Sequence, residues 1–245
     1  MKKSFYLIGC LLLTSACNLP VPTPAPDSTP EETPPPTPEV VTQDPALSIT
    51  ETAVPEIEPP PLYFTEEFDA PSSFWEFHQT GGTQPPTVTI QNGALHIDIA
   101  SSDTWMIGVH NVHSYSNVFV RAKTFLNPGG SVGLICRYSE TGWYEFNAAA
   151  NGEYSVLLGQ WLAPGVAKYI PVIKDISNKL PGSLSNEIGL FCEDNFLQLY
   201  ANGVMIRRVE VTNYGLTEGK AGITASSFAE IPVSAIFEWV QVSQN

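Results

Sequence analysis

Apolar residues alternate with polar ones through most of residues 63–245, and this period of two is the feature that most constrains the fold. Thr87–Gln91 and Ala94–Ile99 alternate on either side of Asn92-Gly93, a pair that tolerates positive φ in a two-residue hairpin turn. A second hairpin of this kind is expected around Asn202-Gly203. No stretch keeps a period of 3.6 over three helical turns. The pattern predicts an all-β fold, an antiparallel β-sandwich (jelly roll) of about a dozen short strands.

The remaining alternation places most of the other strands. They are expected at Val118–Lys123, Val132–Tyr138, Tyr144–Ala148, Tyr154–Leu158, Ile188–Cys192, Ala221–Ala225 and Val233–Val242. The stretch from Pro164 to Ser185 is the least regular, and we expect a long loop there with one strand inside. Residues 63–245 hold all five tryptophans and are long enough to bury one core, so one domain is expected.

Residues 1–16 have the parts of a secretion signal. Two lysines precede Phe5–Leu13, an apolar stretch too short to span a bilayer as a helix. Small residues then lead to Cys17, in an order that resembles the lipobox of bacterial lipoproteins. The resemblance implies cleavage before Cys17, lipidation with chains such as palmitate, and an anchor in the cell membrane on its extracytoplasmic face. The alternative is cleavage near Ala16 and a freely secreted product.

The segment after Cys17 differs sharply from the rest of the chain. Residues 18–62 contain 14 of the 22 prolines and eight carboxylates, with no Lys, Arg, Gly or aromatic residue. Such a segment cannot bury enough apolar surface to offset its conformational entropy, so a disordered Pro/Thr-rich linker is expected. Extended at about 3.1 Å per residue, it reaches about 140 Å. The expected organisation is a signal peptide at 1–16, a lipidated cysteine and linker at 17–62, and a sandwich at 63–245.

The charge of the expected domain limits its partners. Residues 63–245 carry 9 Lys and Arg against 17 Asp and Glu, a net charge of −8, and no basic cluster. Nucleic acid and anionic lipid surfaces are both held mainly by cationic side chains, so neither is expected as a partner of this domain. Nothing in the sequence indicates an oligomer, and a monomer is expected.

Several motifs follow one another in an order that resembles a known superfamily. They are Phe64–Asp69, Gly133–Tyr138, Trp143–Phe146, Asn186–Cys192, Leu197–Gly203 and Gly219–Ile223. Their order resembles the concanavalin A-like lectin/glucanase superfamily, with laminin G-like modules of bacterial lipoproteins and the family labelled 3-keto-disaccharide hydrolase as the nearest look-alikes. The resemblance implies a two-sheet sandwich that holds sugars on a concave sheet face or in rim loops. The last strand reads Phe237-Glu238-Trp239-Val240 where such domains usually have Phe-Asp-Asn/Asp-Phe, so a role of that Asp does not carry over.

Two cysteines lie in the expected domain. Cys136 and Cys192 each fall in the middle of a strand, on the face that we assign to the core. Outside the cytoplasm two such thiols oxidise if they are close, so a Cys136–Cys192 disulfide is expected; the alternative is two buried thiols. The chain has no Cys-x-x-Cys, and its four histidines are scattered, so no metal or other cofactor is expected. The alternative, raised by the resemblance, is calcium near Asp69 and Glu238.

The strand around Trp143 suggests a sugar-binding surface. Trp143, Glu145 and Asn147 share one face, while Tyr144 and Phe146 take the core face. Position 137 lies on the face opposite Cys136 and is expected to point away from the core. The candidate carbohydrate-binding set is Arg121, Arg137, Trp143, Glu145 and Asn147, with Trp105 and Trp161 as rim residues. The alternative is that the tryptophans fill the edges of the sandwich and that Arg137 and Glu145 form a surface ion pair.

Catalysis receives less support from the sequence. Glycoside hydrolysis needs two carboxyl groups about 5–9.5 Å apart, and family 16 glucanases place theirs as Glu-x-Asp-x-x-Glu on one strand. This chain has no such triplet, and Glu145 stands alone on its strand. The sequence therefore predicts a non-catalytic, surface-tethered lipoprotein that binds carbohydrate or another envelope glycan. The alternatives are a structural or protein-interaction lipoprotein of the envelope and a glycosidase-like hydrolase.

Overall fold

The computed structural model describes residues 58–180 and 185–244. The expectations about the signal peptide, the lipidation of Cys17 and nearly all of the linker fall outside these residues. Within them the regular structure is almost entirely β, with one 3-10 turn at Thr212–Tyr214. None of the described residues forms a helix that is long and apolar enough to cross a membrane. The expected antiparallel β-sandwich is confirmed, with fifteen strands in two sheets.

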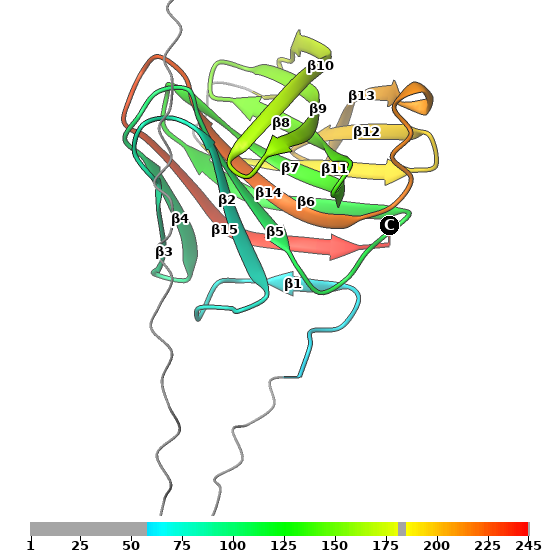
Figure 1. The fold of residues 1–245 in the computed structure, drawn as a ribbon, viewed down its shortest axis with the longest axis horizontal. Helices are drawn as coiled ribbons and strands as arrows, with labels where there is room; N and C mark the ends of the chain where they lie inside the picture. Colours follow the sequence, from blue (N-terminus) through cyan, green and yellow to red (C-terminus); the bar gives the residue numbers. More distant parts are fainter. Residues whose placement is uncertain (1–57, 181–184, 245) are drawn as a thin grey trace, which may run out of the picture. The chain divides into compact units, whose positions relative to one another are not determined.

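One sheet has eight strands. They are β1 (Phe64–Glu66), β3 (Thr87–Gln91), β4 (Ala94–Ile99), β6 (Val118–Leu126), β11 (Ser185–Glu193), β12 (Phe196–Ala201), β13 (Val204–Glu210) and β15 (Val233–Ser243). Their order across the sheet is β13-β12-β11-β6-β15-β4-β3, and β1 pairs with β15 (Figure 1). Both Asn-Gly hairpins are confirmed, because Asn92-Gly93 and Asn202-Gly203 have positive φ between paired strands.

The other sheet has seven strands. They are β2 (Trp75–Gly81), β5 (Thr104–His110), β7 (Gly130–Ser139), β8 (Gly142–Ala149), β9 (Glu153–Ala163), β10 (Val166–Ile176) and β14 (Lys220–Ser227). Their order is β10-β9-β8-β7-β14-β5-β2, and every pairing is antiparallel. This sheet carries the residues that shape the candidate site.

The core lies between the two sheets and follows the predicted alternation. Burial alternates along the whole of β6, and Tyr144 and Phe146 of β8 are buried in the core as expected. The predicted disulfide is confirmed: Cys136 of β7 and Cys192 of β11 are bonded, with their Cα atoms 6.6 Å apart. It joins the two sheets across the core.

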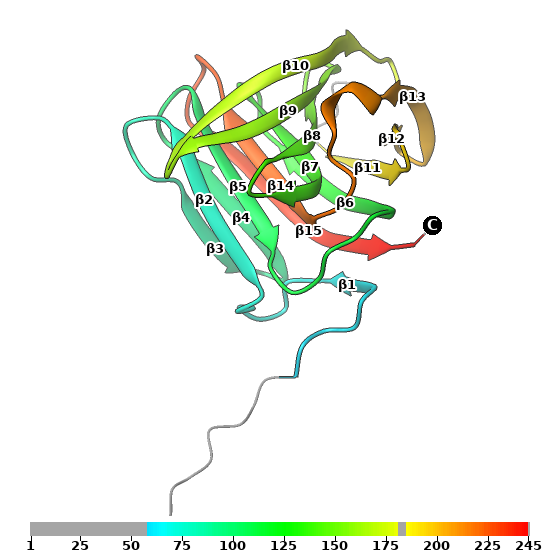
Figure 2. The same ribbon diagram turned by 45° about the vertical axis from the view of Figure 1, so that its right-hand side comes forward.

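The strand expected between Pro164 and Ser185 is β10, and it changes the shape of the domain. It lies at the edge of the seven-stranded sheet, where Pro171 is tolerated beside a bulge because no outer strand needs its missing N–H. The β9–β10 hairpin curls over the side of this sheet that faces away from the core, here called the concave face, and reaches β2 (Figure 2). There the Ala167 N–H donates to Thr80 Oγ1 at 3.0 Å. As a result, β7 and β8 are buried on both of their faces.

Candidate functional site

Aromatic side chains form a continuous row across the concave face, here called the aromatic row. Its members are Phe228, Trp105, Tyr169, Trp143, Trp161, Tyr138 and His78. The ring centroids of Trp105 and Tyr169 are 5.2 Å apart, and those of Trp143 and Trp161 are also 5.2 Å apart. Trp161 Nε1 donates to the Tyr138 hydroxyl at 2.9 Å, which fixes both rings. The row gives the concave face a small apolar cluster of its own.

A carboxyl group lies beneath this row. Glu145 of β8 is fully buried, and it accepts hydrogen bonds from Trp143 Nε1 at 3.0 Å and from Asn147 Nδ2 at 2.7 Å. Burial raises the pKa of Glu145 above its ordinary value of 4.5, and the hydrogen bonds from Trp143 and Asn147 oppose that shift only in part. This carboxyl group therefore keeps its proton to a higher pH than a glutamate in water.

Asn147 separates this carboxyl group from a cavity, here called the Asn147 cavity. The cavity has a volume of about 310 Å³. Its walls combine aromatic and polar groups: Trp105, Phe228, Asn147, Ser226, Glu153 and Lys174. The Lys174 ammonium lies 3.6 Å from the Glu153 carboxylate. Flat rings beside hydrogen-bonding groups are the combination that a sugar requires, because rings cover its C–H faces and polar groups meet its hydroxyls.

Three residues of the predicted carbohydrate-binding set lie together at this site. Trp143, Glu145 and Asn147 share a face of β8, as expected. That face is not open to solvent, since the exposed fractions are 0, 0 and 5 %. The alternation along β8 predicted which residues share this face, but it did not predict that β10 covers the face.

The expectation that Arg137 points away from the core is wrong. A bulge between Cys136 and Ser139 interrupts the pairing of β7 with β8, and Arg137 itself has a positive φ of 54°. Its side chain is 1 % exposed and donates to the backbone carbonyls of Ser116, Leu216 and Asp194. Arg137 therefore ties three loops together at the end of the sandwich and forms no surface ion pair with Glu145.

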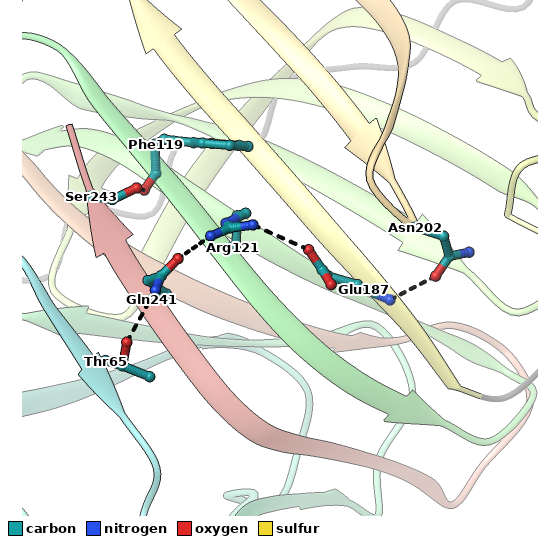
Figure 3. Close-up of polar contacts among 7 residues, drawn as sticks. All are labelled: Thr65, Phe119, Arg121, Glu187, Asn202, Gln241 and Ser243. Carbon is teal, nitrogen blue, oxygen red and sulfur yellow. Dashed lines mark hydrogen bonds and ion pairs between the residues drawn. The ribbon is translucent and has the colours of Figure 1, made fainter. Parts of the chain in front are cut away.

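Arg121 lies on the other sheet, away from the concave face. Figure 3 shows it on β6 between Gln241 of β15 and Glu187 of β11. Its guanidinium donates to the Gln241 side chain and lies 3.6 Å from the Glu187 carboxylate. The structure thus does not bring Arg121 and Arg137 to the Trp143 face. The two expected rim residues, Trp105 and Trp161, are both members of the aromatic row.

Sequence reasoning missed Glu153, Lys174, Tyr169 and Phe228. Along β9, Glu153 alternates with the buried Tyr154, so its side of the sheet was readable from the sequence. The distance between Glu153 and Asn147 could not be predicted from the sequence, because it depends on the register in which Asn147 pairs with Ser155. Lys174 and Tyr169 belong to β10, whose mixed polarity gave no clear pattern.

No group of three or more potential metal-ligating side chains occurs in the described part of the chain. Asp69 and Glu238, the candidates for calcium, are both exposed. The absence of a cofactor stays the prediction, with calcium at these two residues as its alternative.

Two curled antiparallel sheets give this domain the concanavalin A-like sandwich fold, as the sequence motifs predicted. No protein-family model and no curated protein match the sequence. Among solved structures, the chain is similar to a β-glucanase from Bacillus licheniformis, with 15% identity, a TM-score of 0.52, and coverage of 75% of this chain and 98% of that one.

Two further structures agree with this result. A β-1,3-1,4-glucanase (lichenase) derived from a mouse hindgut metagenome has 13% identity, a TM-score of 0.52, and coverage of 75% of this chain and 99% of its own. A glycoside hydrolase family 16 endo-glucanase from Bacteroides ovatus has 9% identity and the same TM-score, with 74% of this chain and 99% of that one covered. At these identities the likeness establishes the fold.

The comparison corrects the expectation of a non-catalytic binding module and of a protein that is not an enzyme. The sandwiches that this chain resembles are those of endo-glucanases. The glycosidase-like alternative fits them better than a non-catalytic binder does. Two carboxylates were expected on one strand, whereas in the structure Glu153 of β9 lines the Asn147 cavity and Glu145 of β8 lies behind Asn147.

Proposed function

We propose that this protein is a glycosidase-like hydrolase that cleaves a glycan at the Asn147 cavity. The observation that carries the proposal is Glu145, a carboxyl group whose pKa is raised by burial beside a cavity with aromatic and polar walls. Glycoside hydrolysis needs such a group, because the leaving oxygen must receive a proton at a pH where an ordinary glutamate has already lost it.

Each residue at the cavity has a role in this proposal. Glu145 is the proton donor, and the Asn147 amide, which now lies between it and the cavity, rotates aside when the sugar binds. Glu153 is the second carboxylate, oriented by Lys174. Trp105 and Phe228 pack against the C–H faces of the sugar.

The positions of the two glutamates favour the inverting form of the reaction. Glu145 pairs with Leu157 of β9, four residues beyond Glu153, which is about 13 Å along the strand at about 3.3 Å per residue. This offset is too long for the carboxyl separation of about 5–5.5 Å in retaining enzymes, so we propose the inverting form, in which about 6.5–9.5 Å leaves room for a water molecule. Glu153 takes a proton from that water, the water oxygen bonds to the anomeric carbon, and the bond to the leaving oxygen breaks as Glu145 protonates it.

The solved structures suggest which glycans to test first. They include a β-1,3-1,4-glucanase and endo-acting O-glycanases that initiate mucin breakdown, so β-glucans and mucin-type glycans are the first candidates. We also propose that Cys17 carries the lipid that holds the domain at the extracytoplasmic face of the membrane. A Pro/Thr-rich linker of the kind expected from the sequence would let it reach a polymeric glycan.

Release of reducing sugar from these glycans by the mature protein tests the proposal. Glu145→Gln and Glu153→Gln should each lower the rate by about 100-fold or more, the usual contribution of a general acid or base. The control is Glu140→Gln, because Glu140 lies on the other side of the aromatic row. Absence of hydrolysis of every glycan by the wild type, or full activity in Glu145→Gln, would contradict the proposal.

A further inference from the structure

The concave face of this sandwich is closed across its middle. The tip of the β9–β10 hairpin reaches β2, where the Ala167 N–H donates to Thr80 Oγ1. A Cβ atom added to Gly165 at this tip would lie 3.8 Å from the Gln79 carbonyl oxygen, which is ordinary contact distance. The hairpin therefore spans the face from one edge strand to the other (Figure 2).

The space beneath the hairpin is filled by the aromatic row. A Cβ atom added to Gly159 would lie 2.2 and 2.3 Å from two ring atoms of Trp143, so this ring lies directly against the backbone of β9. The Tyr169 ring packs edge-on to Trp143, with centroids 5.9 Å apart, and its hydroxyl is buried. No room is left between hairpin and sheet for a chain of sugars.

The row separates two hollows. The Asn147 cavity lies on one side of it, and a hollow of about 600 Å³ around His78, Glu140 and Pro164 lies on the other. No residue lines both spaces, and the closed part between them contains Trp143, Glu145 and Tyr169. The Asn147 cavity is therefore blind where it meets the aromatic row.

The size of the cavity agrees with this geometry. Its volume of about 310 Å³ is at the lower end of the range of about 300–1,000 Å³ for small-molecule sites. A polysaccharide that binds through its interior has to leave a site on both sides, and the aromatic row closes the side of the Asn147 cavity that faces the second hollow. An oligosaccharide or the end of a chain needs an opening on only one side of the site.

We propose that the Asn147 cavity takes its substrate end-on, so that the protein acts on chain ends and short oligosaccharides and not on the interior of polysaccharides. This inference rests on the proposed hydrolase function and specifies its substrate class. It sets the protein apart from the endo-glucanases whose fold it shares, since those act within chains.

The first test compares viscosity with the release of reducing ends when the mature protein degrades a soluble β-1,3-1,4-glucan, or the glycan found in the activity screen. End-on action should release reducing sugar steadily, with short products and little early fall in viscosity. An early fall in viscosity with products of mixed length would overturn the inference and leave the hydrolase proposal standing. Absence of hydrolysis would count against the hydrolase proposal alone.

Binding tests the inference without hydrolysis. Cyclic glucans have no chain ends, so quenching of the protein's tryptophan fluorescence is compared for a linear and a cyclic oligosaccharide of the same linkage. Quenching is expected from the linear sugar only, and it should be lost in Trp105→Ala because Trp105 lines the cavity. Equal quenching by the cyclic sugar, or no quenching by the linear one, would overturn end-on entry.

Variants of the aromatic row test whether its rings are what excludes the cyclic sugar. Tyr169→Ala and the double change Trp161→Ala with Tyr169→Ala remove rings between the two hollows, and the cyclic sugar should then quench. Tyr200→Ala is the matched control, because Tyr200 packs against Phe119 on the other sheet and should change nothing. Circular dichroism establishes that each variant is folded. A folded double variant that still excludes the cyclic sugar would show that the row is not the barrier.

Discussion

Two buried titratable residues give the domain opposite responses to pH. Glu145 lies under the aromatic row, and burial raises its pKa. His110 lies at the end of β5, packed against Phe64 and Trp75, and its Nδ1 atom has no hydrogen-bond partner. Burial favours the neutral form of both groups. Glu145 therefore lowers the free energy of unfolding as pH rises, and His110 lowers it as pH falls.

We predict that Glu145→Gln removes part of the loss of stability at rising pH. The folded-state pKa is above the unfolded value, so the unfolded chain releases this proton first as pH rises above about 4.5. From there up to the folded pKa the free energy of unfolding falls by as much as about 1.4 kcal/mol per pH unit from this group. Denaturant unfolding from pH 4.5 to 7.5 should give a flatter profile for Glu145→Gln than for the wild type, with Glu153→Gln as control. Parallel profiles would mean that Glu145 is charged in the folded state.

His110→Leu is predicted to protect the domain in acid. Burial, with a smaller contribution from His113, lowers the pKa of His110 from 6.5 to about 4. The unfolded chain therefore binds a proton that the folded chain does not, and up to about 3 kcal/mol of stability is lost as pH falls from 6.5 to 4. The difference between the free energies of unfolding at pH 7 and at pH 4.5 should be smaller in His110→Leu than in the wild type, and unchanged in the control His96→Gln. An unchanged gap would show that other groups cause the acid sensitivity.

At the level of single residues, the sequence predicted which side chains share a strand face better than it predicted which of them are exposed to solvent. The shared face of Trp143, Glu145 and Asn147 followed from alternation alone. The burial of Arg137 did not, because one bulge shifts a side chain to the other face and leaves no mark in the residue types.

Among the elements, the β9–β10 hairpin has the greatest influence on the site. Its second strand is an edge strand with exposed and partly buried residues in no simple order. One strand was predicted in this stretch, but nothing in its residues indicates that it covers another part of the same sheet. The central strands were easier to predict, because two neighbours and a core impose a regular pattern on them.

The disulfide between β7 and β11 is predicted to contribute several kcal/mol. Cys136 and Cys192 are 56 residues apart, and closing a loop of that length restricts the unfolded chain by about 4 kcal/mol in the chain-entropy model. Replacing both cysteines with alanine should lower the free energy of unfolding by about 2–4 kcal/mol, measured by denaturant unfolding under oxidising conditions. The wild type treated with reductant in denaturant is the matched comparison and should lose a similar amount. Equal stability of the oxidised wild type and the variant would contradict the prediction.

For the whole molecule, the junction between linker and sandwich is well defined. His113 Nε2 lies 2.8 Å from the Pro60 carbonyl oxygen, and the Tyr115 hydroxyl donates to the Leu62 carbonyl at 2.7 Å. These two contacts fasten the last residues before β1 to the loop that follows β5. The residues just before β1 are therefore held at a fixed point of the domain.

We predict that Cys17→Ser releases the domain from the membrane. Without the thiol no lipid can be attached at this position, and the expected anchor is lost. Metabolic labelling with palmitate followed by fractionation should show label and membrane association in the wild type and neither in the variant. Cys10→Ser is the control and should behave as wild type. Retention of label in Cys17→Ser would place the lipid elsewhere.

The position of β15 has a consequence for the timing of folding. β15 is the last strand in the sequence, yet it lies inside the eight-stranded sheet, between β6 and β4, and also pairs with β1. The sheet cannot close around a gap at its centre, so this domain stays incomplete until its final residues are available. A chain that is made amino end first can therefore complete this domain only after β15 has been made.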